Sequence, residues 1–273
     1  MASSTPLMSY QHTVEVLKRL ANLEHQIVLV GGQAVNFWAN YYKNKAPQLA
    51  AYAPYTSKDI DFVGPKEAVR ECAKRLGGTA KLATFDDVNT PNTGVVMFID
   101  SENHARHIDF LGSVAGVADA ELIETAASAR LEDEEGCPVA SFLIINPVLC
   151  LKSRVHNVAY LPGYQTEHAR KQLRAAIICA KQFAADELET DPRKTLDCNE
   201  KIFDIARYGA GIEVFVHHRI DVLEAIVDAP GLPEKFYTER LPRARAAVKR
   251  ARAKEFAAME RARVIAERKQ TSR

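Results

Sequence analysis

Apolar residues in the first half of the chain switch repeatedly between the spacing of helices and that of strands. Helical spacing predicts helices over 9–23, 33–42, 66–76 and 118–129. Short runs rich in β-branched residues, bounded by glycine, proline and other turn-forming residues, predict strands at 27–30, 59–63, 94–99, 106–111 and 139–144. Segment 100–103 favours a hairpin between two of these strands. Segment 46–55, which contains two prolines, is expected to form an inserted loop.

The second half of the chain has helical periodicity alone. This periodicity begins at Val148 and continues to the end, with breaks near 162–163, 191–192, 209–211 and 230–233. Strands mixed with helices, followed by helices without strands, are typical of an α+β domain with a helical domain behind it. We therefore expect an N-terminal domain at 1–145, a helical domain at 146–239 and a basic C-terminal helix at 240–273.

The composition is that of a soluble protein with a buried core. The 273 residues are 47% hydrophobic and 26% charged, which argues against a disordered, collagen-like or disulfide-scaffold protein. Five scattered cysteines without a Cys-x-x-Cys pair indicate neither a zinc site nor a disulfide framework, and Cys150 and Cys179 are expected to be buried thiols. No signal peptide or membrane-length apolar run is visible, so we expect a cytoplasmic protein without membrane contact.

The net charge of +1 conceals a strong asymmetry along the chain. Residues 240–273 contain twelve basic and three acidic residues, so this tail carries +9 and the rest of the chain carries −8. One interpretation is a solvated helix that pairs with the acidic body. The other is a cationic surface for a nucleic-acid backbone. Because few aromatic residues lie between the cations, a duplex or a tRNA-like molecule fits better than a single strand.

Three aspartates in predicted strands are the strongest sign of chemistry. Asp59 and Asp61 are two residues apart, so in a strand they share one face, where their charges repel unless a cation lies between them. Mg²⁺ is bound by a few carboxylates together with substrate phosphates and water. Asp109 lies in an apolar strand, where a lone carboxylate is costly. Three such carboxylates can hold two metal ions about 4 Å apart, as in phosphoryl transfer.

A double glycine, Gly31-Gly32, lies where a predicted strand leads directly into a helix. Free N–H groups at a helix start favour phosphate. Taken separately, the glycines are explained by turn chemistry and the Asp-x-Asp pair by an exposed strand end. Their order along the chain, with a further strand aspartate behind them, is more specific.

Segments Val30–Ala34, Ser57–Asp61 and Ile108–Phe110 together resemble the signature of the DNA polymerase β-type nucleotidyltransferase superfamily. The nearest branch is the AbiEii-like group of toxin nucleotidyltransferases. The resemblance covers about residues 25–180 and is tight only at these three motifs. It implies an N-terminal nucleotidyltransferase domain with a mixed β-sheet flanked by helices, followed by an all-helical C-terminal domain.

The same resemblance implies a role for each motif residue. Gly31 and Gly32 would shape the loop over a nucleoside triphosphate, and Ser57 would contact its phosphates. Asp59 and Asp61 would bind Mg²⁺ or Mn²⁺. Asp109 would ligate the catalytic metal and help to deprotonate the attacking hydroxyl. Lys152 matches a family lysine that reaches the phosphates or base, and Arg154 is a weaker candidate.

Some other residues invite a functional interpretation. His107 shares the face of Asp109, which allows a role in the pocket, although a surface or hairpin histidine is the favoured interpretation. Phe37, Trp38 and Tyr41, on the helix after the glycines, are expected to pack against the sheet.

The sequence thus predicts an enzyme, a metal-dependent nucleotidyltransferase that moves a nucleoside monophosphate from a nucleoside triphosphate to a hydroxyl acceptor. The toxin resemblance suggests tRNA or a protein as the acceptor, a toxin–antitoxin or phage-defence role, and an antitoxin protein as a partner. Two alternatives are a nucleotidyltransferase for small molecules of the aminoglycoside type and a non-catalytic binding module that retains the fold. An antitoxin-like regulatory partner is a further, weaker reading.

Overall fold

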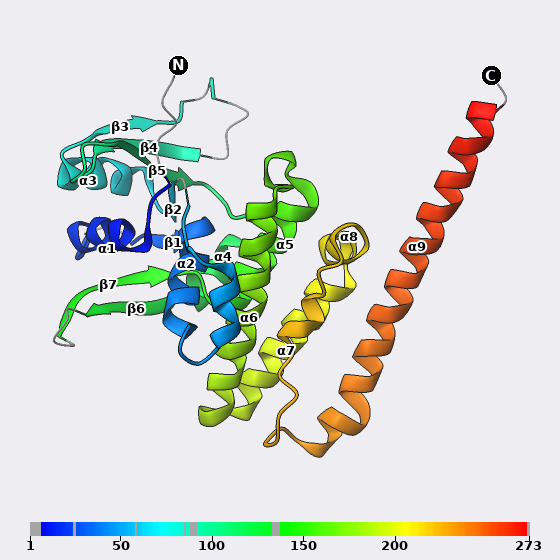
Figure 1. Ribbon diagram of the computed structural model, residues 1–273. Coiled ribbons are helices and arrows are strands. Elements are labelled where there is room, and N and C mark those ends of the chain that lie inside the picture. The colour runs from blue at the N-terminus through cyan, green and yellow to red at the C-terminus, as the bar shows by residue number, and fades with distance from the viewer. Residues whose placement is uncertain are drawn as a thin grey trace. The chain divides into compact units, whose positions relative to one another are not determined.

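The computed structural model describes residues 7–23, 26–57, 59–84, 86–87, 92–132 and 137–271 (Figure 1). The chain divides into two compact units, Met1–Arg154 and Val155–Arg273. The division into domains at 1–145, 146–239 and 240–273 stays a prediction.

The first unit contains a seven-stranded mixed sheet. Its strands are β1 (Val28–Val30), β2 (Ile60–Val63), β3 (Thr79–Leu82), β4 (Asn92–Ile99), β5 (Ala105–Leu111), β6 (Ala127–Glu132) and β7 (Pro138–Ile144). The spatial order is β3-β4-β5-β2-β1-β7-β6. The pairs β2–β5 and β1–β7 are parallel, and the other neighbouring pairs are antiparallel. Parallel pairing of β2 with β5 is what brings two of the acidic motifs together.

Helices accompany the strands of this unit (Figure 1). They are α1 (Tyr10–Arg19), α2 (Gly31–Tyr42), the 3₁₀ helix η1 (Pro47–Tyr52), α3 (Lys66–Leu76), α4 (Asp119–Thr125) and the part of α5 (Pro147–Tyr160) up to Arg154. Helix α3 ends at Gly77, whose φ of 62° forms a left-handed cap. The predicted α+β class, a mixed sheet flanked by helices and followed by an all-helical part, is confirmed.

Alternation along the central strands separates a buried face of the sheet from a more open one. Ile60 and Phe62 of β2 and Ile108 and Phe110 of β5 are fully buried, and the two phenylalanine rings lie 5.8 Å apart. The intervening Asp61 and Asp109 point to the opposite face, where they are only partly covered. Burial of the apolar set therefore fixes the register that presents the two carboxylates.

Several predicted elements need correction. Strands β3 and β6 were not expected, and β6 occupies residues assigned to the end of a helix at 118–129. The alanine-rich segment favours a helix locally. Its antiparallel pairing with β7 overrides that preference. Residues 46–55, expected as a loop, contain η1, which buries Leu49 completely.

The aromatic residues of α2 follow the prediction in two of three cases. Phe37 and Trp38 are buried, and Nε1 of Trp38 donates a hydrogen bond to the backbone oxygen of Ile145 at 2.9 Å. The prediction is wrong for Tyr41, because that residue is 59% exposed.

The predicted hairpin is confirmed, and it joins β4 to β5. Asp100 organises its turn by accepting hydrogen bonds from the backbone N–H groups of Glu102 and His104. The other Asp100 oxygen accepts from Nε of Arg106, at 2.7 Å, and Arg106 is buried. This buried pair anchors the start of β5, one residue before His107.

The second unit is helical in its described residues, as predicted from the periodicity. Beyond the end of α5 it comprises η2 (Pro162–Tyr164), α6 (Glu167–Thr190), α7 (Pro192–Arg207), α8 (Gly209–His218), η3 (Val222–Ala225), the π-helical turn η4 (Phe236–Arg240) and α9 (Leu241–Thr271). The predicted breaks near 191–192 and 209–211 lie at the junctions of α6 with α7 and of α7 with α8. The break near 162–163 falls in η2, and the one near 230–233 lies in the segment between η3 and η4. Cys150 of the first unit and Cys179 of the second are buried, as expected.

Helix α9 is fastened to its own unit through Arg252. This guanidinium pairs with Asp221 and lies over the ring of Phe215, 3.6 Å from its centroid. Arg240 and Arg245 form further ion pairs with Glu200 and Asp228. Among the described residues, none of the helices combines the length and apolar composition needed to cross a membrane.

Candidate metal and nucleotide site

Two neighbouring parallel strands carry two of the three predicted carboxylates. Asp61 of β2 is the register partner of Asp109 of β5, so the two side chains lie on the same face of adjacent strands. Asp59 immediately precedes β2, in a bend. The expectation that Asp59 lies within the strand is therefore wrong, and its orientation is not set by strand alternation.

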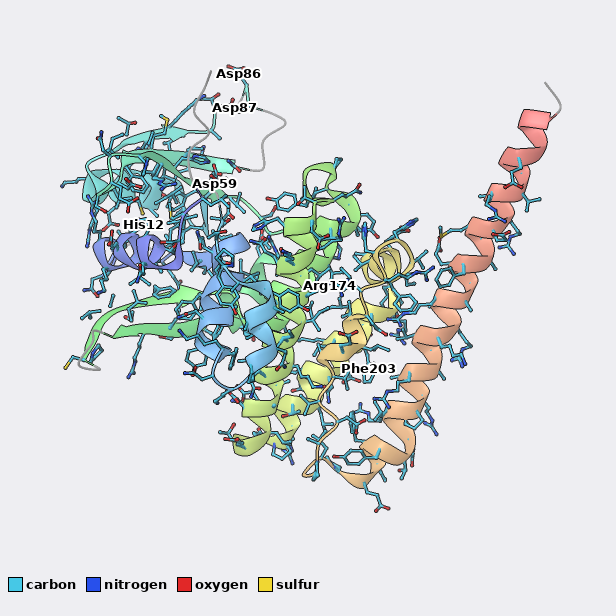
Figure 2. All side chains as sticks on the ribbon, in the orientation of Figure 1. His12, Asp59, Asp86, Asp87, Arg174 and Phe203 are labelled. Atoms are coloured by element: carbon cyan, nitrogen blue, oxygen red, sulfur yellow. The ribbon has the colours of Figure 1, made fainter. Side chains whose placement is uncertain are left out.

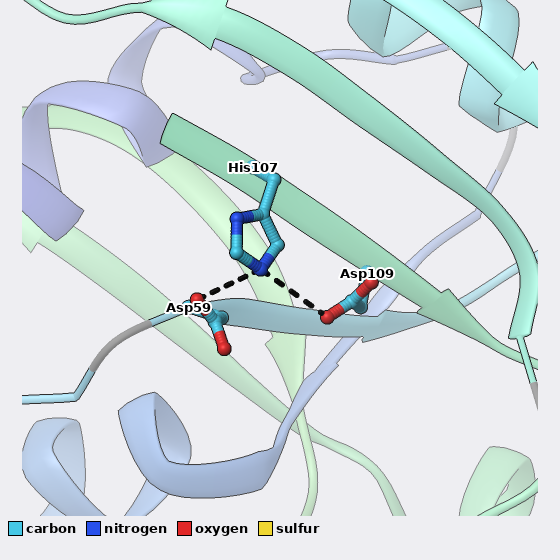
Figure 3. A group of neighbouring side chains, drawn as sticks. All are labelled: Asp59, His107 and Asp109. Carbon is cyan, nitrogen blue, oxygen red and sulfur yellow. Dashed lines mark ion pairs between the residues drawn. The ribbon is translucent and has the colours of Figure 1, made fainter. Parts of the chain in front are cut away.

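Asp59 and Asp109 converge on His107 (Figure 3). Nε2 of His107 lies 2.8 Å from Oδ1 of Asp59 and 3.8 Å from Oδ2 of Asp109. One ligand atom from each of the three residues lies within 4.8 Å of the other two. The side chains of His107, Asp59 and Asp109 are 47%, 32% and 21% exposed, so the cluster is accessible to solutes. Figure 2 shows Asp59 among the strands of the first unit.

The third aspartate, Asp61, lies against the glycine turn. A Cβ atom at Gly31 would overlap the Asp61 carboxylate, and the φ of Gly31 is +70°. Burial raises the pKa of Asp61 to about 6, with the charges of Asp109 and Asp59 adding to the rise and that of Arg154 opposing it. Asp61 thus stands beside the Asp59–His107–Asp109 cluster without belonging to it.

The double glycine forms the first turn of α2, two residues earlier than predicted. The residue before it, Val30, provides no side-chain cap for this turn. The first N–H groups of a helix have no partner within the helix and carry a partial positive charge. The first turn of α2 lies beside the Asp61 carboxylate. Backbone N–H groups that could bind an anion are therefore close to the acidic residues.

The remaining predicted nucleotide-binding residues lie at different places in the first unit. Ser57, two residues before Asp59, forms a backbone bridge with Met8. Lys58, between Ser57 and Asp59, lies outside the described residues. Lys152 of α5 forms an ion pair with Glu121 of α4 at 3.6 Å. Its neighbour Arg154 is buried and its charge acts on Asp61. Arg154 is therefore the cation of α5 that the structure links electrostatically to the carboxylates.

Mutual interactions shift the titration of the cluster. A hydrogen bond to Asp59 raises the pKa of His107, and the surrounding carboxylates add to this rise although burial opposes it. Burial also raises the pKa of Asp109, against the charge of His107 and a hydrogen bond from Nδ2 of Asn92 at 2.9 Å. The two neighbouring carboxylates repel one another, and a cation between them would relieve that repulsion.

The donor set fits one divalent ion. Adjacent ligands about 2.1 Å from a common ion lie about 3 Å apart. The distances of 2.8 and 3.8 Å among the three side chains are close to this spacing. Asp59 and Asp109 supply oxygen ligands, and His107 supplies nitrogen.

Two residues of this site, His107 and Asn92, have only weak signals in the sequence. The period-two alternation of β5 placed His107 with Asp109, but it could not show that Asp59 reaches the same point. Asn92 was not singled out, because its hydrogen bond to Asp109 depends on the pairing of β4 with β5.

A separate groove of about 490 Å³ lies between α7 and α9 in the second unit. Phe203 (labelled in Figure 2) and Phe236 contribute apolar surface to it. Four arginines also line the groove, Arg207, Arg240, Arg243 and Arg250. The first three form ion pairs with Asp204, Glu200 and Glu239.

Comparisons with known proteins give distant structural similarity only. The antibiotic-resistance factor ANT(2'')-Ia matches with a TM-score of 0.37 and 11% identity, over 70% of this chain and 91% of that protein. The polyadenylate synthase of Megavirus matches with a TM-score of 0.34 and 12% identity, over 70% of this chain and 38% of that protein. No protein-family model and no curated protein matches the sequence. The function is therefore inferred from the residues of the chain itself.

Proposed function

We propose that the chain is a metal-dependent nucleotidyltransferase that transfers a nucleoside monophosphate from a nucleoside triphosphate to a hydroxyl acceptor. The observation that carries this proposal is the convergence of Asp59 and Asp109 on one point, with Asp61 joining them to the uncapped start of α2. Carboxylates for a divalent ion and N–H donors for phosphate are the two requirements for binding a metal–nucleotide complex.

Each residue has a defined part in the proposal. Asp59 and Asp109, with Asp61 beside them, hold the divalent ion, Mg²⁺ or Mn²⁺, which neutralises phosphate charge when bound. Gly31 and Gly32 direct backbone N–H groups to the phosphates, and Ser57 and Lys152 complete the nucleotide site. Arg154 adds positive charge next to Asp61.

The proposed reaction needs only the nucleoside triphosphate and the hydroxyl acceptor as reactants. The acceptor oxygen forms a bond to the α-phosphorus, the bond from that phosphorus to the α,β-bridging oxygen breaks, and pyrophosphate leaves. Asp109 accepts the proton of the attacking hydroxyl, a role that suits a carboxylate whose pKa is raised by burial. Positioning and charge neutralisation supply most of the acceleration.

We further propose RNA as the acceptor, recognised by the basic tail. Three tail arginines, Arg240, Arg245 and Arg252, form ion pairs with acidic residues outside the tail in the same unit. Four other tail cations are exposed and have no ion-pair partner among the described side chains: Lys249, Arg250, Lys254 and Arg261. Exposed cations favour a phosphate backbone, whereas a cationic aminoglycoside would favour an acidic surface.

Membership of the AbiEii-like branch, a cytoplasmic location and a role as a toxin with a protein antitoxin complete the proposal. The branch and the toxin role depend on the three sequence motifs alone. A small antitoxin-like reading frame beside the gene would support the toxin role, and growth arrest on expression would test it directly.

Transfer of label separates this proposal from its alternatives. The purified protein is incubated with Mg²⁺ or Mn²⁺, each nucleoside triphosphate labelled at the α or the γ phosphate, and total RNA, protein or aminoglycosides. We expect α label in RNA and none from the γ position, and the Asp59→Ala, Asp61→Ala double variant should lose it. Unchanged transfer by that variant contradicts the proposal. Nucleotide binding without transfer to any acceptor supports the non-catalytic module.

A further inference from the structure

His107 lies on the same face of β5 as Asp109, beside the proposed metal site. It lies two residues before Asp109 on β5, so both side chains project from the same face of one strand. Its backbone is held in register opposite Met97 of β4, and the preceding Arg106 is anchored by its buried pair with Asp100. The imidazole is therefore presented from a fixed strand position.

Nε2, the nitrogen farthest from the backbone, is the atom that faces both carboxylates. Its distances of 2.8 Å to Asp59 and 3.8 Å to Asp109 resemble the separations between neighbouring ligands of one ion. A histidine that only oriented one carboxylate would need contact with that carboxylate alone. Here the same nitrogen lies between two.

We propose that His107 binds the divalent ion directly through Nε2, together with Asp59 and Asp109, and that the site consequently prefers Mn²⁺ to Mg²⁺. The inference rests on the metal site of the proposed function and adds a nitrogen ligand to it. Mg²⁺ selects oxygen ligands, whereas imidazole is a good ligand for first-row transition ions. A site with one nitrogen and two carboxylates therefore favours the transition ion.

Pulsed electron paramagnetic resonance of Mn²⁺ bound to the full-length protein detects a directly bound imidazole by its ¹⁴N modulation. We expect ¹⁴N modulation in the wild type and its loss in His107→Gln. Affinity for Mn²⁺ should fall about tenfold in that variant, with a smaller change for Mg²⁺. Because His107 is half-exposed, the variant is expected to fold, and circular dichroism verifies this.

His217 provides a matched control. It is exposed to almost the same extent as His107, 48% against 47%, and its Nε2 also pairs with a carboxylate, that of Glu213 at 3.1 Å. His217→Gln should keep both the ¹⁴N modulation and the Mn²⁺ affinity. Mn²⁺ bound without ¹⁴N modulation, or modulation that persists in His107→Gln, overturns the inference. Modulation from His107 in a protein that transfers no nucleotide supports the ligand and contradicts only the proposed function.

Discussion

The carboxylate of Asp61 occupies the space that a side chain at Gly31 would need. This contact joins the end of β1 and the start of α2 to β2, so the glycine turn and the acidic strand form one structure. Two physical reasons require glycine here, since φ is +70° and a Cβ atom would overlap the carboxylate. The phosphate-binding and metal-binding halves of the proposed site thus depend on one another.

Gly31→Ala should destabilise the protein more than positive φ alone explains. Gly77 also has positive φ, but a Cβ there would meet open space, so Gly77→Ala should cost only about 1 kcal/mol. Gly31→Ala adds the overlap with Asp61, for about 1–3 kcal/mol more. Urea denaturation of the two variants measures the difference. Equal losses would show that Asp61 does not fill this space.

Asp61→Asn should stabilise the metal-free protein at neutral pH. The folded pKa of about 6 exceeds the ordinary value of 3.8, so the folded state binds this proton more tightly than the unfolded state. The stabilisation from that proton is complete below about pH 4 and is lost as pH rises through 6. We expect the variant to gain up to about 3 kcal/mol of unfolding free energy at pH 7.5.

Chemical denaturation at pH 4.5 and pH 7.5 in the presence of a chelator tests this sign. The gain of Asp61→Asn over the wild type should shrink strongly at pH 4.5. A variant that is less stable than the wild type by the same amount at both pH values would show that the pKa of Asp61 is not raised in the folded protein.

Arg252 and Asp221 should couple strongly in the stability of the second unit. Burial raises the pKa of Asp221, but hydrogen bonds from Arg252 and from the backbone of Leu223 outweigh it, so the net shift is downward. The stabilisation is therefore present above the ordinary pKa of the carboxyl and is lost as pH falls through the lowered folded value. At pH 7, a double-mutant cycle of Arg252→Met and Asp221→Asn should give about 1–3 kcal/mol of coupling.

The exposed pair Arg263–Glu260 is a suitable control, because both side chains are more than half exposed. Its cycle should give less than about 0.5 kcal/mol. Similar coupling in the two cycles would show that Arg252 does not fasten α9.

The regular parts of the fold could be predicted because their signals are local. Residues 66–76 form α3 as expected, and Gly77 ends it with a left-handed cap. Strands β2 and β5 follow from dense apolar runs. The edge strand β3 carries no comparable pattern, since its residues are mostly exposed and it is defined by pairing with β4.

The residues of the site could be predicted from the sequence, but their arrangement in space could not. Alternation correctly placed His107 and Asp109 on one face, yet the favoured interpretation treated His107 as a surface residue. It is half-exposed and also faces two carboxylates. The convergence of Asp59 depends on a bend before β2, and that of Asp61 with Gly31 depends on tertiary packing. Neither can be derived from local spacing.

Binding of a non-transferable nucleotide tests the central claim most directly. An α,β-methylene nucleoside triphosphate is titrated calorimetrically into the wild type and into Asp109→Asn, with Mn²⁺ and then with a chelator. The account predicts one metal-dependent site per chain in the wild type and at least about tenfold weaker binding in the variant. Binding that survives the chelator, or equal affinity in Asp109→Asn, would contradict it.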